Sequence, residues 1–139
     1  MITSIERVLY TAKTHTTGGR DGAGQSSDGS VDVKLSSPGS GRPGTNPEQL
    51  FAIGWSACFM GAMGLAAGKR KIRLPADVAV DAEVDLGTTD GAYLLRARLN
   101  VLVPGLERDV AQALVDEAHQ TCPYSKATRG NLDVVINLV

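Results

Sequence analysis

The chain has 139 residues, of which 42% are hydrophobic and only 4% aromatic, and its net charge is -1. This length predicts a single domain over residues 1–139, with a core of Val, Leu, Ile and Ala rather than of aromatic side chains. The nearly balanced charge leaves no strongly basic field for nucleic acid or for an anionic membrane, so neither is an expected partner.

The first third of the chain is predicted to form strands separated by loops. β-Branched residues alternate loosely over Ile5–Thr16 and apolar residues alternate strictly over Ser30–Leu35, which is typical of half-buried strands. Glycines dominate Thr17–Gly24, and Pro, Gly and Ser dominate Ser36–Thr45. We therefore expect a loop or turn at each of these two segments.

A long apolar helix is predicted next, beginning at Asn46 or Pro47 and ending at Ala67. Asn is a good N-cap, Pro suits the first helical position, and Glu48 favours the positive end of the helix. Gly68 is expected to stop it. Its many Gly and Ala residues permit close packing on all sides, so we expect a buried central helix. The glycines also make it a poor membrane span.

The C-terminal half is predicted to contain three strands and one helix. Alternating strands at Val78–Leu86 and Ala92–Val103 flank an Asp-Gly hairpin turn. An amphipathic helix is predicted over Leu106–Thr121 and a last strand over Asp133–Val139. The order ββ-α-ββ-α-β, with hairpins rather than alternating strands and helices, predicts an α+β fold with antiparallel sheets.

The two cysteines are the clearest candidates for reactive residues. Cys58 lies in the apolar helical run, and Cys122 directly precedes the helix-breaking Pro123. So few cysteines do not make a secreted disulfide framework, so we expect a cytoplasmic protein with reduced thiols. A thiolate at neutral pH needs a positive neighbour, for which Arg20, flanked by glycines, is the first candidate and Arg42 the second. On these residues alone, Cys58 as an inert core residue stays an open alternative.

Two other uses of the thiols are less favoured by spacing. A zinc site would combine Cys58 and Cys122 with His15 and His119, but the four residues lack finger-like spacing. A cysteine hydrolase would need one of these histidines beside Cys58. We therefore expect no bound metal.

Several short segments together resemble a known family. They are Thr17–Gly22 (TGGRDG), Ser26–Gly29 (SSDG), Asp32–Leu35 (DVKL), Gly44–Ala52 (GTNPEQLFA), Ser56–Phe59 (SACF) and Cys122–Ala127 (CPYSKA). In these segments the chain resembles the organic hydroperoxide resistance (Ohr) branch of the OsmC/Ohr family, and the resemblance covers essentially the whole chain. It implies an OsmC-like fold, with antiparallel β-sheets around a buried central helix, in an intertwined homodimer.

The resemblance also implies a thiol-dependent peroxidase, an oxidoreductase that reduces alkyl and fatty-acid hydroperoxides to alcohols. Cys58 matches the peroxidatic cysteine and Cys122 the resolving cysteine. Arg20 matches the arginine that polarises thiolate and peroxide, and Glu48 the carboxylate that holds this arginine. A Cys58–Cys122 disulfide would follow from a Cys58 sulfenic acid and would be recycled by dihydrolipoamide or a lipoylated enzyme, with no bound cofactor. An OsmC-branch peroxidase of broader substrate range and a non-enzymatic redox-sensing module stay open.

One geometric question follows from the spacing of two of these residues. Glu48 and Cys58 are ten residues apart, which is about 15 Å along a straight helix, too far for both to touch Arg20. Either the helix starts later, or it bends near Gly54, or Glu48 acts on the arginine of the other subunit. An apolar substrate also needs an apolar entrance. Five side chains are candidates for it, although core packing is expected for at least half of them: Trp55, Phe59, Met60, Met63 and Tyr124.

Overall fold

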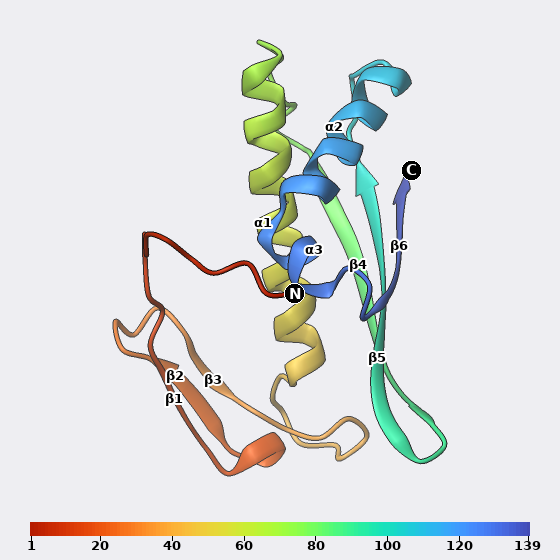
Figure 1. Cartoon of the computed structure of the whole chain (residues 1–139). Coiled ribbons are helices and arrows are strands. Elements are labelled where there is room, and N and C mark those ends of the chain that lie inside the picture. Colours follow the sequence, from red (N-terminus) through yellow and green to blue (C-terminus); the bar gives the residue numbers. More distant parts are fainter. The chain divides into compact units, whose positions relative to one another are not determined.

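The computed structural model describes residues 1–139, which form two compact units, Met1–Pro47 and Glu48–Val139. Figure 1 shows the helices and strands of both units in sequence colours. Each unit is described by itself below. The single domain expected over the whole length stays a prediction.

The first unit contains a small antiparallel sheet with the strand order β1-β2-β3. Its strands are β1 (Thr14–Thr17), β2 (Ala23–Ser26) and β3 (Asp32–Lys34), and a 3-10 turn, η1 (Gly19–Asp21), joins β1 to β2. The strand predicted around β3 is confirmed. The loop predicted between β1 and β3 is only partly right, since β2 begins within it.

The long N-terminal strand predicted from Ile5 is wrong, except for its last residues in β1. Thr14 pairs with Ser26, the last residue of β2, and the chain turns away directly after it. Beyond this point only Lys13 pairs, since its carbonyl oxygen accepts the N–H of Ser27 at 2.9 Å, and the residues before Lys13 have no strand beside them. β-Branched composition indicates a strand only where a neighbouring strand supplies hydrogen bonds.

The central helix α1 runs from Pro47 to Lys69, and its predicted start is confirmed. The predicted stop at Gly68 is wrong. Lys71 takes the left-handed conformation with φ of 55°, and the N–H of Ile72 donates to the carbonyl oxygen of Ala67 at 2.9 Å. This is the hydrogen-bond pattern of a Schellman cap, so a lysine rather than a glycine terminates the helix.

The second unit also holds a sheet of strand order β4-β5-β6. Its strands are β4 (Ala79–Thr89), β5 (Ala92–Leu102) and β6 (Asp133–Leu138). The predicted β4–β5 hairpin is confirmed, with positive φ at Asp90 (50°) and Gly91 (81°), as a type I′ turn requires.

The prediction that all sheets are antiparallel is wrong at the last strand, because β6 pairs parallel to β5. A parallel pair needs a long crossover connection. Two helices provide it here: α2 (Arg108–Thr121), which was predicted, and α3 (Pro123–Thr128), which was not. The α+β class is confirmed.

The core lies between the inner face of this sheet and the helices on it (Figure 1). Its largest fully buried side chains come from α1, β5 and α2, as expected from the alternation of β5 and the amphipathic pattern of α2. They are Trp55, Phe59, Met63, Leu99, Val101, Leu114 and Val115.

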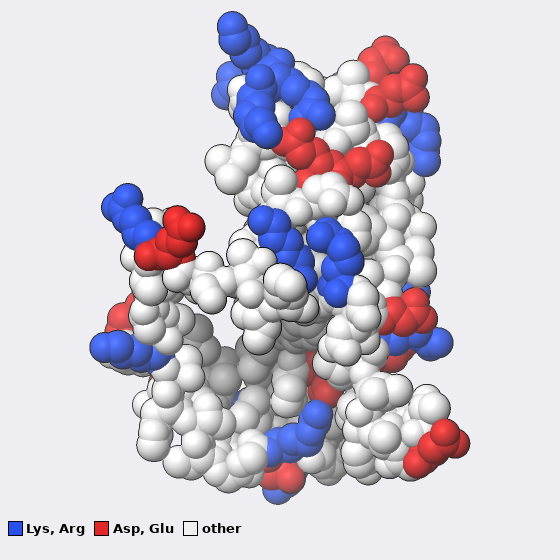
Figure 2. Space-filling model, viewed as in Figure 1, with Lys and Arg blue, Asp and Glu red and all other residues white.

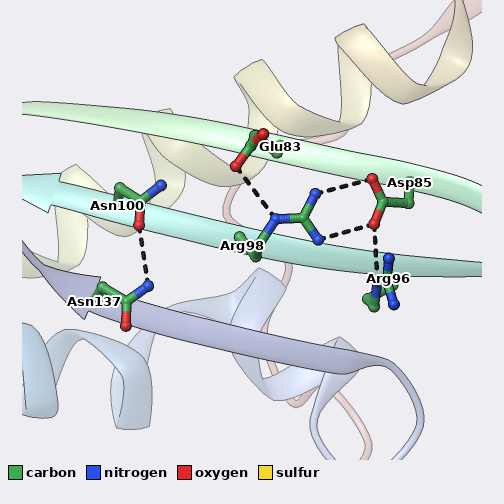
Figure 3. A network of polar contacts seen from close by, with 6 residues as sticks. All are labelled: Glu83, Asp85, Arg96, Arg98, Asn100 and Asn137. Atoms are coloured by element: carbon green, nitrogen blue, oxygen red, sulfur yellow. Dashed lines mark hydrogen bonds and ion pairs between the residues drawn. The ribbon is translucent and has the colours of Figure 1, made fainter.

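The outer face of the same sheet carries polar side chains (Figure 3). Arg98 on β5 makes a bidentate ion pair with Asp85 on β4, at 2.8 and 2.9 Å, and its Nε donates to Glu83 at 3.2 Å. Arg96 donates to the same Asp85 at 2.8 Å. The sheet therefore has a dry inner face and a charged outer face.

Helix α1 is long and apolar enough to cross a membrane by length and composition, so the sequence-based exclusion of a span was too strict. The core helices of globular proteins often have this length and composition too. Trp55, Phe59 and Met63 pack into the core of the second unit, so we interpret α1 as a core helix. Lys and Arg side chains gather at its C-terminal end (Figure 2), where Lys69 and Arg70 pair with Glu117 of α2.

Candidate active site

The first thiol, Cys58, lies in the middle of α1 and is partly buried against the core. Phe51, Gly54 and Trp55 precede it at helical spacing. Residues three, four and seven positions apart share one face of a helix. The thiol therefore stands at the end of a short, defined stripe on α1.

The second thiol, Cys122, is fully buried at the junction of α2 and α3. Its N–H donates to Ala118 at 2.8 Å and closes α2, while its carbonyl oxygen accepts the N–H of Lys126 at 2.9 Å and opens α3. Pro123 forces this break, because it holds Cys122 in an extended conformation. The cysteine is thus fixed by backbone hydrogen bonds on both sides.

The structure brings the two thiols together: both are free, and Cys122 lies close enough to Cys58 to act on its pKa. Burial raises the pKa of the Cys58 thiol, and the neighbouring Cys122 raises this pKa further, whereas the backbone N–H of Tyr124 lowers it. The second unit alone therefore favours the protonated thiol. A reactive thiolate needs an added positive charge.

Helix α3 is seated on the stripe of α1 that leads to Cys58. The ring of Tyr124 stacks on that of Phe51, with centroids 6.2 Å apart. A Cβ added at Gly54 would lie 3.1 Å from the Tyr124 hydroxyl oxygen. The indole N–H of Trp55 donates to the hydroxyl of buried Ser125 at 3.3 Å. These contacts connect the helix of one thiol with the turn of the other.

Arg20 lies in η1 of the first unit and Glu48 in the first turn of α1, on either side of the division between the units. Steric constraints explain why glycines occupy positions 18 and 22 on either side of Arg20. Gly18 has a φ of 72°, and a Cβ at Gly22 would lie 1.8 Å from the carbonyl oxygen of Thr17. The tight turn that presents the arginine therefore tolerates no side chain at Gly22.

The second candidate arginine, Arg42, has a structural partner. Its guanidinium contacts the carboxylate of Asp21 at 2.6 Å, and the same carboxylate accepts the backbone N–H and the hydroxyl of Ser37 at 3.1 Å. The Ser37 hydrogen bonds, and the charge of Arg42, lower the pKa of Asp21. Arg42 thus ties the loop after β3 to η1 beside Arg20.

Three of the five candidates for the apolar entrance, Trp55, Phe59 and Met63, are fully buried core residues, as the expectation of core packing for at least half of them requires. Met60 is partly buried, and Tyr124 is 39% exposed. The sequence placed all four α1 residues on one apolar helix, but the side of that helix that meets the sheet depends on tertiary packing.

The predicted alternatives with histidine lack support in the geometry. No three His, Cys, Asp or Glu side chains gather as a metal site would require. The buried Nδ1 atom of His119 has no hydrogen-bond partner, and burial lowers the pKa of this histidine, as does the charge of Arg129. Arg129 also donates to the backbone carbonyl of His119. This histidine belongs to the packing between α2 and the segment after α3.

Sequence reasoning missed α3, and with it the parts played by Gly54 and Ser125. The signal for Gly54 was present in its helical spacing from Cys58. The pairing of Ser125 with Trp55 had no local signal, because the two residues are 70 positions apart.

Comparisons with known proteins are consistent over the whole chain. Residues 37–137 match the family model of OsmC-like proteins. The "Organic hydroperoxide resistance protein" of Xanthomonas axonopodis pv. citri is 50% identical, with 97% of this chain and 98% of that protein covered. The crystal structure of the organic hydroperoxide resistance protein OhrB of Bacillus subtilis is 43% identical, with a TM-score of 0.88 over 95% of this chain and 100% of that one. The crystal structure of an organic hydroperoxide resistance protein from Elizabethkingia anophelis is 38% identical, with a TM-score of 0.82 over 95% of this chain and 97% of that one.

Proposed function

Since the chain belongs to the organic hydroperoxide resistance branch of the OsmC/Ohr family, we propose that it is a thiol-dependent peroxidase that reduces alkyl and fatty-acid hydroperoxides. The observation that carries the proposal is that the free thiols of Cys58 and Cys122 are neighbours. The first is reachable from one side, and the second is buried directly beside it. That arrangement suits one attacking thiol and one resolving thiol.

In the proposed reaction, the Cys58 thiolate attacks the distal oxygen of the hydroperoxide, and the O–O bond breaks. The distal hydroxyl is transferred to sulfur, so Cys58 becomes a sulfenic acid. The alkoxide leaves as an alcohol once it takes a proton from solvent, which replaces the one that the thiol released on ionisation. The Cys122 thiol then displaces the sulfenic oxygen, so that water leaves and a disulfide forms. An external dithiol, dihydrolipoamide or a lipoylated enzyme, reduces this disulfide by thiol exchange and becomes a cyclic disulfide.

Because the pKa of Cys58 is raised, the proposed arginine has to lower it for a thiolate to form. We propose that Arg20 supplies the positive charge that favours the thiolate and that stabilises the leaving oxygen, with Glu48 holding its guanidinium. Because α1 begins at Pro47, a later helix start is excluded. Two explanations remain for Glu48. Either α1 bends near Gly54, so that Glu48 and Cys58 reach the same guanidinium, or Glu48 holds the arginine of another subunit.

A second copy of the chain is the proposed cover for the exposed side of α1. Ile53 and Leu65 are 68% and 75% exposed, and Ala57 and Gly61 between them are also exposed. Such an apolar face is unusual for a monomer. This face supports the homodimer expected from the resemblance. We also propose a cytoplasmic location, which would supply the reducing environment for the resting thiols.

The test is an anaerobic thiol titration of the full chain after one equivalent of cumene hydroperoxide. The proposal expects the loss of both thiols per chain, a mass lower by two hydrogens, and recovery of both thiols with dihydrolipoamide. The same assay with hydrogen peroxide separates an organic-hydroperoxide enzyme from a broader OsmC-branch peroxidase. If no hydroperoxide is consumed with any dithiol, the enzyme proposal fails and a redox-sensing module takes its place.

A further inference from the structure

The stripe of α1 residues that ends at Cys58 has a structural role that the proposed chemistry does not itself require. Phe51, Gly54 and Trp55 all contact α3, the helix that begins directly after Cys122. The next residue on this stripe is Cys58 itself. One helix face therefore carries both the reactive thiol and the seat of the segment that holds its partner.

The contact at Gly54 leaves little room for a side chain. A Cβ at this position would lie 3.1 Å from the hydroxyl oxygen of Tyr124 and 3.5 Å from two of its ring carbons. On the same helix, a Cβ at Gly61, Gly64 or Gly68 would meet nothing within 4 Å. Gly54 is therefore the α1 glycine that lets an aromatic ring lie close to the helix.

The contact at Trp55 is polar and dry. Its N–H donates to the Ser125 hydroxyl at 3.3 Å, and both side chains are fully buried. A buried indole N–H is costly to leave unpaired, so the hydrogen bond fixes where Ser125 can lie. Ser125 is three residues after Cys122 and in the same short helix as Tyr124.

We propose that Gly54, Trp55 and Ser125 are positioning residues, which hold the segment Cys122–Ser125 against α1 so that the second thiol stays within reach of Cys58. The inference rests on the proposed function, because it assumes that these thiols form the redox pair. It assigns to α3 the role of keeping the pair preorganised, so that the disulfide closes without a rearrangement of the chain.

The reaction that tests positioning needs no hydroperoxide. Diamide takes two electrons and two protons from the thiol pair, which leaves the Cys58–Cys122 disulfide and the reduced hydrazine. The disulfide equilibrium against dithiothreitol then reports how well the thiols are placed. Gly54→Ala is expected to lower the equilibrium constant for disulfide formation by about tenfold, because a displaced α3 reduces the effective concentration of Cys122.

Gly68→Ala is the matched control, since it makes the same change on the same helix in open space. Alanine favours a helix more than glycine does, so both variants are expected to fold. The control equilibrium constant is expected to stay within about twofold of the wild type, as independent sites do not couple. Equal constants for the two variants would overturn the proposal, as would equal melting-temperature shifts with no change in either equilibrium.

A second set of variants tests the hydrogen bond itself. Ser125→Ala and Trp55→Phe are each expected to lower the equilibrium constant, and the double variant is expected to lower it no further than the more affected single variant. Additive effects would show that the two residues act separately and would contradict the proposal. Trp55 is the single tryptophan of the chain, so its fluorescence should change on disulfide closure in the wild type.

The same experiments separate this inference from the proposed function. A wild type that closes its disulfide with diamide, shows the Gly54 effect, and yet consumes no alkyl hydroperoxide would refute the peroxidase and support the positioning residues. Full peroxidase activity in Gly54→Ala and Ser125→Ala, with unchanged disulfide equilibria, would support the enzyme and refute the positioning residues.

Discussion

The thiol pair and the outer face of the β4–β5–β6 sheet use polar groups in opposite ways. The sheet face has several strong ion pairs around Asp85 and Arg98, all near solvent (Figure 3). The thiol region has few polar contacts, but Cys122 and Ser125 are fully buried. Exposed pairs add little because water competes for them, whereas a buried group without its partner is costly. The number of polar contacts is therefore a poor guide to importance here.

The largest effect is expected at the thiols. Cys58→Ser should lower hydroperoxide turnover by at least about a thousandfold, because a serine hydroxyl is no thiolate and cannot become a sulfenic acid. Cys122→Ser should consume about one equivalent of hydroperoxide and then stall with Cys58 as its sulfenic acid. Peroxide consumption and trapping with dimedone measure both. Sustained turnover of either variant would contradict the two-thiol mechanism.

The next effect is expected at Arg20. Arg20→Met should slow the reaction with cumene hydroperoxide by about a hundredfold, since it removes the charge that we propose stabilises thiolate and leaving oxygen. It should also raise the pKa of Cys58, so that alkylation by iodoacetamide shifts to higher pH. Arg42→Met is the control, because this arginine is paired with Asp21. Equal losses in both variants would mean that the turn, and not the charge of Arg20, is what matters.

A smaller effect on stability is expected from the buried hydrogen bond. Ser125→Ala should lower the free energy of unfolding by about 1–3 kcal/mol, because it leaves the Trp55 N–H buried without an acceptor. Urea unfolding followed by circular dichroism measures the change. Lys126→Ala, on the exposed side of α3, should change the free energy little. A Ser125→Ala variant as stable as the Lys126→Ala control would remove the contrast between the two regions.

The smallest effect is expected at the sheet face. The Arg98 and Arg96 hydrogen bonds hold the pKa of Asp85 well below its usual value of 3.8. Because the pKa is lower in the folded state, the ion pairs stabilise the folded protein fully above pH 3.8, the usual value. This stabilisation is lost as the pH falls toward the lower pKa of the folded state.

Asp85→Asn should therefore destabilise slightly at neutral pH, less in high salt and less below pH 3.8, without changing peroxide turnover. Urea midpoints at neutral and acid pH, with and without salt, measure this. Asp81→Asn on the same face of β4, opposite Asn100, is the control. A large and salt-independent loss would show that the exposed network matters more than its position indicates.

The elements with strong local signals could be predicted from the sequence. The strict alternation around β3, β4 and β5 and the Asp90–Gly91 turn led to the correct strands, since side-chain period and turn chemistry act over a few residues. Errors arose where distant segments decide. The predicted strand has no partner strand before Lys13, and β6 pairs parallel to β5 because two helices intervene.

The sequence by itself determined the candidate chemistry. Two cysteines, an arginine in a tight glycine turn, and an Asn-Pro-Glu helix start pointed to the family that the comparisons confirm. Only the tertiary structure decided which face of α1 meets the core, and how α3 brings Cys122 beside Cys58, a pairing that the family resemblance had implied. The reason is the distance along the chain over which each effect acts. Residue type and short spacing act locally, whereas thiols 64 positions apart meet only when the packing of a buried helix, a missing side chain and one hydrogen bond fix the intervening chain.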